Sequence, residues 1–388
     1  MKSIFLLTIS LLIAGSLQAQ QPSEKQLANW LKRFPAADTN KDGKLSAKEI
    51  RAFHDKRNAR RGQAQRGVVR QFSVNPGWAK APEFPKHALM YKSPSELAKL
   101  GTVRSFPKTE GVLRIVGTGH SFMVPGYKTL PAIAKAAGFE QPLHLHTGGG
   151  MTGSTRYKWE QENGIFQFDK RPNPVLLPSI ANAKWEAMMW GPYFNDRPAY
   201  YLCWMDFCLK YNPGMKFFLS DAWPQIHQFG EKPPKSEKEL TAKVWRRMGA
   251  QKNAEFNKLV DTLNTKHPGK VFIIPTSDAM VLAAEHFLRG ELPGVQGLHK
   301  AVGGHERSLW RDRLGHLGPG FNRLEGYVFY ATLYGRSPEL IEGDIEFGGF
   351  KEFPNRTLDR TFRKIAWQAV INHPHSGVKD EDANGVRD

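Results

Sequence analysis

The chain has 388 residues, of which 40% are hydrophobic and 24% are charged, and this balance excludes a wholly disordered protein. Its two cysteines exclude a scaffold dense in disulfides and a zinc site with four cysteine ligands. Lys and Arg number 55 against 37 Asp and Glu, so the formal net charge is +18. Such a charge favours an anionic surface or polymer as a neighbour.

The first residues predict an export signal. Lys2 precedes an apolar stretch at 4–14, which is followed by Gly15, Ser16 and the small residue Ala19. A basic start, an apolar run and a small-residue cleavage site are typical of a secretory signal peptide. We therefore expect residues 1–19 to be removed and the mature protein to be secreted or periplasmic.

Residues 38–49 predict a calcium-binding loop. Oxygen-bearing side chains occupy loop positions 1, 3, 5, 9 and 12, glycine occupies position 6, and position 7 offers a backbone carbonyl, as in an EF-hand. The predicted Ca²⁺ ligands are Asp38, Asn40, Asp42, Lys44, Ser46 and Glu49. Apolar residues at helical spacing flank the loop, so residues 20–60 predict a small helical EF-hand module.

Two further segments show no clear helix or strand pattern. Residues 61–110 are rich in Lys, Arg and Pro and predict a basic linker. Residues 378–388 predict an acidic tail, which is either disordered or a partial second calcium loop. Within this tail, residues 380–388 repeat the first nine positions of the EF-hand pattern but lack its closing glutamate.

From residue 111 onward, expected strands alternate with expected helices. The strands are at 112–116, 143–146, 185–190, 216–219 and 271–274, and the main helices are at 197–210, 239–265, 278–288 and 320–334. This alternation predicts an α/β domain at 111–377 with a doubly wound, mostly parallel sheet. In such sheets the functional residues lie beyond the carboxyl ends of the strands.

A serine and a histidine form the predicted catalytic pair. Ser121 directly follows the first strand, so its hydroxyl can project from the edge of the sheet. A serine hydroxyl becomes a strong nucleophile when a neighbouring base takes its proton. His316 is the predicted base, and Asp312 is the nearest carboxylate that can fix its tautomer. Backbone N–H groups of Ser121 and of Gly149 or Gly150 are expected to hold the developing oxyanion.

These motifs resemble the conserved blocks of the SGNH (GDSL-type) hydrolases. Residues 119–122 (Gly-His-Ser-Phe) resemble the first block, 148–150 (Gly-Gly-Gly) the second, and the stretch around His316 the last. The resemblance covers residues 112–337. It implies a flavodoxin-like fold and hydrolysis of an ester, often an acetyl ester on carbohydrate. It also implies a side-chain amide in the oxyanion hole, for which Asn195 is the candidate.

The resulting hypothesis is a secreted serine esterase that acts on an acylated polysaccharide, with no nucleic-acid partner. The basic charge of the chain favours an anionic polysaccharide. Two spacings differ from the family pattern. Asp312 stands four residues before His316 instead of three, and Gly191 and Asn195 are four apart instead of two. These differences favour the alternative of a non-catalytic, calcium-dependent glycan-binding protein on the same fold.

Other polar residues offer further alternatives. His144 and His146 share one side of a strand and, with His120, could bind a metal for a metal-dependent hydrolase. His305 is a rival for the role of base. Asp278 follows the fifth strand and is expected to cap a helix instead of taking part in catalysis.

Overall fold

The computed structural model describes residues 24–46, 49–50, 52–53, 92–147, 165–166, 171–172, 176–191, 198–229, 233–343, 345 and 353–388. Contacts within the chain divide it into two compact units, 1–76 and 77–388. The first unit contains α1 (Glu24–Arg33) and the short 3₁₀ helix η1 (Pro35–Ala37). The expected signal peptide lies outside the described residues. No described helix is long and apolar enough to cross a membrane.

The second unit is built on a five-stranded parallel sheet with the order β2-β1-β5-β6-β7. The strands are β1 (Ile115–Gly119), β2 (Leu143–Thr147), β5 (Ala187–Trp190), β6 (Lys216–Ser220) and β7 (Val271–Ile274). This confirms the predicted α/β class and its parallel sheet. The chain leaves β1 for β2 on one side and continues through β5 on the other, and open α/β sheets bind ligands beyond the carboxyl ends of the strands at such a reversal.

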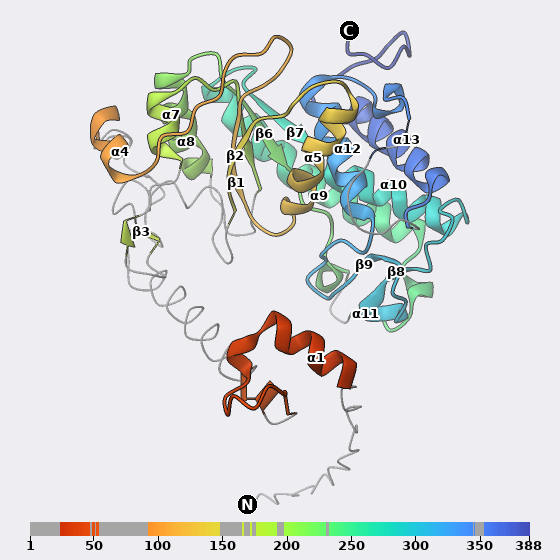
Figure 1. Cartoon of the computed structure of the whole chain (residues 1–388). Helices are drawn as coiled ribbons and strands as arrows, with labels where there is room; N and C mark the ends of the chain where they lie inside the picture. The colour runs from red at the N-terminus through yellow and green to blue at the C-terminus, as the bar shows by residue number, and fades with distance from the viewer. Residues whose placement is uncertain are drawn as a thin grey trace, which may run out of the picture. The chain divides into compact units, whose positions relative to one another are not determined.

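Helices cover both faces of the sheet (Figure 1). On one face lie α5 (Val124–Ala136), α10 (Thr276–Leu288), α12 (Phe321–Tyr334) and α13 (Arg356–Asn372); on the other lie α7 (Leu177–Asn182) and α8 (Pro198–Tyr211). The long helix α9 (Ala242–Lys266) contributes to both cores. Neighbouring strand residues alternate between these cores, since Met188 belongs to one and Met189 to the other.

Smaller elements complete the unit. They are α4 (Pro94–Leu100), β3 (Ile165–Phe166), β4 (Arg171–Pro172), η3 (Ile226–Gln228), η4 (Glu237–Glu239), β8 (Gly297–His299), α11 (Lys300–Gly303), β9 (Ser308–Trp310) and η5 (Pro338–Leu340). Strands β8 and β9 form a separate parallel pair. The segment after β9 carries the predicted base, so this pair sets the direction in which that segment leaves the core.

The structure differs from the predicted linker over its last residues. Ser93 caps α4 by accepting a hydrogen bond from the backbone N–H of Glu96, and Leu97 on this helix is fully buried. Phe106 packs edge-on against Trp185 at 5.6 Å between ring centroids. The segment 92–110 therefore belongs to the α/β unit. Its high Lys and Pro content had favoured a linker, and the short capped helix α4 was not predicted.

The end of the chain also differs from a free tail. The backbone N–H of Ser337 donates to the carbonyl of Gly385 at 2.7 Å, and that of Arg387 donates to the carbonyl of Gly335 at 2.8 Å. These bonds place residues 385–387 against the end of α12. Helix α13, which was not predicted, lies just before this segment and packs against α12 and α10.

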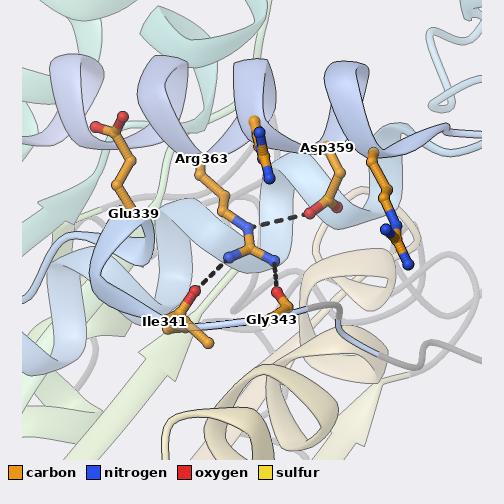
Figure 2. Close-up of a pocket in the computed structure, with 7 residues that line it drawn as sticks. Glu339, Ile341, Gly343, Asp359 and Arg363 are labelled. Carbon is orange, nitrogen blue, oxygen red and sulfur yellow. Dashed lines mark hydrogen bonds and ion pairs between the residues drawn. The ribbon is translucent and has the colours of Figure 1, made fainter.

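A buried ion pair fastens α13 to the segment that follows η5. Arg363 donates to Asp359 Oδ2 at 3.0 Å and to the carbonyls of Ile341 and Gly343 at 2.6 and 3.1 Å. Tyr327 donates its hydroxyl to Asp359 Oδ1 at 2.9 Å. Figure 2 shows Arg363 making these three contacts beside a cavity of about 550 Å³. Each of the three guanidinium nitrogens donates a hydrogen bond, so we interpret this cluster as a structural tie that joins α13 to α12 and to the segment after η5.

Candidate active site

Ser121 lies where β1 gives way to α5. Strand β1 ends at Gly119, residues 121–123 form a turn, and α5 begins at Val124. The turn is closed by the backbone N–H of Met123, which donates to the carbonyl of His120 at 3.1 Å. Ser121 is exposed, whereas Phe122 and Met123 are buried beneath it. The hydroxyl is thus presented to solvent on a short turn whose neighbours are anchored in the core.

A buried carboxyl group from α12 lies at the start of α5, the helix that follows this turn. Glu325 on α12 is 2% exposed and accepts a hydrogen bond from the backbone N–H of Gly126 at 2.8 Å. Burial raises the pKa of Glu325 well above its usual value. This contact ties the first turn of α5, and with it the segment carrying Ser121, to α12.

The segment from Arg311 to His316 is a tight turn that closes on itself. The backbone N–H of Arg311 donates to the carbonyl of His316 at 2.9 Å, and that of Gly315 donates to the carbonyl of Asp312 at 2.9 Å. Asp312 Oδ1 accepts the backbone N–H groups of Leu314 and His316 at 3.1 and 3.2 Å. Gly315 has a φ of +85°, a left-handed conformation that favours glycine. The Asp312 side chain therefore holds the turn together through its hydrogen bonds and also faces the imidazole of His316.

Serine, histidine and aspartate form a continuous hydrogen-bonded chain. Ser121 Oγ lies 2.8 Å from His316 Nε2, and His316 Nδ1 lies 2.8 Å from Asp312 Oδ2. With a carboxylate at Nδ1, the neutral imidazole carries its proton there and leaves Nε2 free to accept the serine proton. The structure therefore brings together Ser121, His316 and Asp312, although Ser121 and His316 are 195 positions apart.

The charge of Asp312 is maintained by its neighbours. Burial acts to raise the pKa of Asp312, but hydrogen bonds from the backbone and ring of His316, together with the charges of His316 and Arg311, outweigh it. The pKa of Asp312 consequently lies below its usual range, and the group is a carboxylate at neutral pH. The side chain of Asp312 is 41% exposed and that of His316 is 18% exposed, so solvent screens part of this interaction.

Two aromatic residues that sequence reasoning missed support the turn. Trp223, just beyond β6, donates from Nε1 to the carbonyl of Gly315 at 2.8 Å. Its ring stacks on Phe122 at 5.0 Å, and Phe122 meets the imidazole of His316 edge-on at 5.3 Å. Trp223 and Phe122 therefore connect the serine turn and the histidine turn through buried packing. The available signal was a tryptophan four residues after the predicted strand 216–219.

The ends of β1 and β5 approach too closely for side chains. A Cβ at Gly119 would lie 3.0 Å from the backbone N of Gly191, and one at Gly191 would lie 3.1 Å from the Cα of Gly119. Glycine at both strand ends leaves backbone, not side chains, next to the serine turn. The other predicted oxyanion residues, Gly149, Gly150 and Asn195, lie outside the described residues.

The other polar residues considered from the sequence are not members of the hydrogen-bonded serine–histidine–aspartate chain. His144 is buried, with its ring 6.0 Å from that of Trp185. In the described ranges, no three His, Cys, Asp or Glu side chains are grouped so that they could hold a metal ion. Asp278 was expected to cap a helix, but it lies within the first turn of α10, where Pro275 is the N-cap residue. Its side chain accepts a hydrogen bond from Asn253 instead. His316, not His305, contacts Ser121.

The predicted calcium loop is folded around its own carboxylates. Gly43 has a φ of +77°, and its N–H donates to Asp38 Oδ2 at 2.9 Å. Glu49 closes the loop, because Oε1 accepts the N–H of Thr39 at 3.0 Å and Oε2 accepts the N–H and hydroxyl of Ser46 at 3.0 and 2.7 Å. These bonds, led by the backbone N–H of Ser46, lower the pKa of Glu49 to about 2.

The same loop contains an oxygen that no hydrogen bond satisfies. Asp38 Oδ1 is shielded from solvent and has no donor among the residues that the structure describes. Helical residues flank the loop, and the rings of Phe34 and Phe53 meet at 5.6 Å between centroids. A shielded anionic oxygen in a loop of oxygen donors is a suitable ligand for a hard cation.

Comparison with known proteins returned one distantly similar solved structure. No family model and no curated protein matches the chain. The structure is similar to the crystal structure of a DUF4886 family protein from Bacteroides uniformis, with a TM-score of 0.46 and 11% sequence identity. The match covers 67% of this chain and 95% of that one.

Proposed function

We propose that the protein is a serine ester hydrolase of the SGNH type. The hydrogen-bonded chain Ser121–His316–Asp312 carries this proposal, because it joins a nucleophile, a base and a carboxylate within direct reach. The strand order, which reads 2-1-3-4-5 when the five sheet strands are numbered along the chain, is the flavodoxin-like order expected for such a fold. Ser121 follows the carboxyl end of the first strand, which agrees with a catalytic role for the serine and with the flavodoxin-like strand order.

The proposed reaction has two halves. Ser121 Oγ attacks the ester carbonyl carbon while His316 Nε2 takes the hydroxyl proton, and the resulting imidazolium is stabilised by Asp312. His316 then returns the proton to the departing alcohol, leaving an acyl group on Ser121. Water attacks this acyl-enzyme with His316 again as base, which releases the carboxylic acid and restores the serine.

Carbohydrate esters are the proposed substrates. Ser121 is exposed, which suits an acyl group carried on a large polymer. The formal charge of +18 favours an anionic polysaccharide over a neutral one, since attraction between opposite charges raises the encounter rate. We infer that the mature protein works outside the cytoplasm.

A serine-directed fluorophosphonate tests this function directly. Because His316 activates the hydroxyl, we expect the purified mature protein to be labelled stoichiometrically, with the adduct on Ser121 by peptide mass spectrometry. Denatured protein is the control, since unfolding separates Ser121 from His316. A native protein that resists the reagent, or is labelled elsewhere, would contradict the proposal.

The loop 38–49 is proposed to bind Ca²⁺ as an EF-hand. Asp38, Asn40, Asp42, Ser46 and Glu49 would supply side-chain oxygens and Lys44 its backbone carbonyl. The shielded, donor-free Asp38 Oδ1 supports this assignment. Bound Ca²⁺ would neutralise the carboxylates of the loop and stabilise the first unit; the reaction proposed for Ser121 does not use it.

Substitution of the closing glutamate tests the calcium site. Glu49→Gln removes the charge and one of the two anionic oxygens at position 12, so we expect calcium affinity at this loop to fall by about tenfold or more. Isothermal calorimetry on the mature chain measures the change. Lys44→Gln is the matched control, because position 7 contributes its carbonyl and not its side chain. Equal affinities in the two variants would contradict the assignment.

A non-catalytic glycan-binding protein remains the second candidate. The four-residue spacing of Asp312 and His316 motivated it, but that spacing is accommodated by the tight turn that joins them. Glycan binding without ester turnover, and without phosphonate labelling, would favour this candidate.

A further inference from the structure

The last residues of the chain contain an oxygen atom in an unusual state. Asp380 Oδ2 accepts hydrogen bonds from Trp367 Nε1 at 2.9 Å and from the backbone N–H of Gly385 at 3.1 Å. Asp380 Oδ1, by contrast, is shielded from solvent and has no donor within the described part of the chain. A carboxylate oxygen removed from water without a donor or a cation costs free energy. This oxygen is therefore available as a ligand for a cation.

Oxygen donors suited to a cation surround this position in the sequence. Asp382 and Asn384 follow at the spacing of EF-hand positions 3 and 5, and Gly385 stands at position 6 with a φ of +81°. No Lys or Arg forms an ion pair with Asp380 or Asp382 among the described residues, although the chain as a whole is strongly basic. Within that part of the chain, Asp380 and Asp382 therefore have no salt-bridge partner.

We propose that residues 380–388 form a second Ca²⁺ site. Asp380, Asp382 and Asn384 supply side-chain oxygens, and Val386 at position 7 supplies its backbone carbonyl. The donor set consists entirely of oxygens with two carboxylates at its centre, which selects a hard divalent cation over zinc or copper. Asp380 Oδ1 is the atom that the cation satisfies.

The first loop provides an internal reference for this geometry. Asp38 stands at the same loop position as Asp380, and its Oδ1 is likewise shielded and without a donor. In the first loop Glu49 Oε1 accepts the N–H of Thr39 at position 2, and in the second Asp388 Oδ2 accepts the N–H of Glu381 at that position. Asp388 at position 9 thus takes over the closing contact that the glutamate at position 12 makes in the first loop.

The site has a structural consequence. Gly385 and Arg387 pair with the chain beyond α12, and Trp367 belongs to α13. A cation held by Asp380 and its neighbours would fix the end of the chain to both helices. Its effect is on stability of the α/β unit, so the proposal stands or falls separately from ester hydrolysis.

The test uses the full mature chain with the first loop disabled by Asp38→Asn and Glu49→Gln. Tb³⁺ serves as the luminescent probe and Ca²⁺ as the calorimetric ligand. Because Trp367 Nε1 contacts a proposed ligand, we expect tryptophan-excited Tb³⁺ emission in this background, displaced by Ca²⁺. Extracellular EF-hand sites bind Ca²⁺ with Kd of about 0.1–1 mM, which sets the expected range.

Two further variants make the result specific. Asp382→Asn, added to the disabled background, should weaken Ca²⁺ binding by about tenfold or more, because a central carboxylate is lost. Glu381→Gln removes the same charge from position 2, which EF-hand loops do not use as a ligand, and should change affinity by less than about threefold. Absence of binding at about 10 mM Ca²⁺ in the disabled background, or equal affinities in the two variants, would overturn the proposal.

Discussion

Replacing Ser121 by alanine is expected to lower kcat for ester hydrolysis by about 10⁴-fold or more. The variant loses the oxygen that forms the acyl-enzyme, while His316 and Asp312 keep their contact and leave a base with no nucleophile to activate. Rates measured with a chromogenic acetyl ester and with an acetylated oligosaccharide report the loss. Residual turnover should come from water near His316 and from any donors that polarise the ester.

The fold should survive this substitution. Ser121 is exposed, and its hydroxyl contacts His316 and no core residue in the described structure, so we expect the thermal midpoint and calcium binding to match the parent protein. Ser95→Ala, an exposed serine on α4, is the matched control and should retain full turnover. An active Ser121→Ala protein would remove the serine-nucleophile mechanism, whatever its substrate.

The sheet could be predicted because each strand is a short apolar run with its own turn or helix on either side. Four of the five strands begin within about two residues of their predicted starts; the first is displaced because Val112–Arg114 precede β1 instead of forming it. Parallel pairing then brings the strand ends to one edge, which is why Ser121 could be assigned to the site from sequence.

The partnership of Ser121 and His316 was predictable as a hypothesis, but its geometry was not. Side chains four residues apart can meet on a helix. The structure uses a turn instead, in which the backbone N–H of His316 donates to Asp312 Oδ1 while its ring contacts Oδ2. Such a turn depends on one left-handed glycine, Gly315, and on a carboxylate accepting several donors at once, neither of which leaves a periodic signal.

The supporting residues were missed for a related reason. Trp223 reaches the carbonyl of Gly315 across 92 positions of sequence, and a contact between a side chain and a distant backbone follows from the packed fold alone. The helix at the start of segment 92–110 was not predicted, because the high Lys and Pro content of the segment hides a capping motif formed by only two residues, Ser93 and Glu96. Buried segments can be predicted from long apolar runs in the sequence. The single polar contacts that position the proposed catalytic residues join parts of the chain that are distant in sequence, so they can be identified only in the folded structure.

Changing Asp312 to asparagine is expected to lower kcat by about 10³- to 10⁴-fold with a much smaller effect on KM. Asparagine preserves the acceptor for the N–H groups of Leu314 and His316, so the turn should persist. It removes the anion that holds the imidazole proton on Nδ1 and stabilises the imidazolium. The loss therefore falls on the chemical step, and steady-state kinetics with a small acetyl ester separates kcat from KM.

The pH dependence gives this variant a signature that a merely structural role would not produce. The pKa of Asp312 is lowered in the folded protein, so its charge is present above the ordinary carboxyl range and is lost only as the pH falls through that lowered value. In the parent protein the carboxylate consequently acts on His316 at every pH from mildly acidic upward, and the low-field proton resonance of Nδ1 should be visible there. In Asp312→Asn that resonance should vanish at all pH values. Arg311→Gln, which removes a charge 3.6 Å from Asp312, is the matched control and should keep the resonance with a loss of kcat below about tenfold. If Asp312→Asn instead kept both the resonance and most of kcat, another carboxylate would have to serve His316.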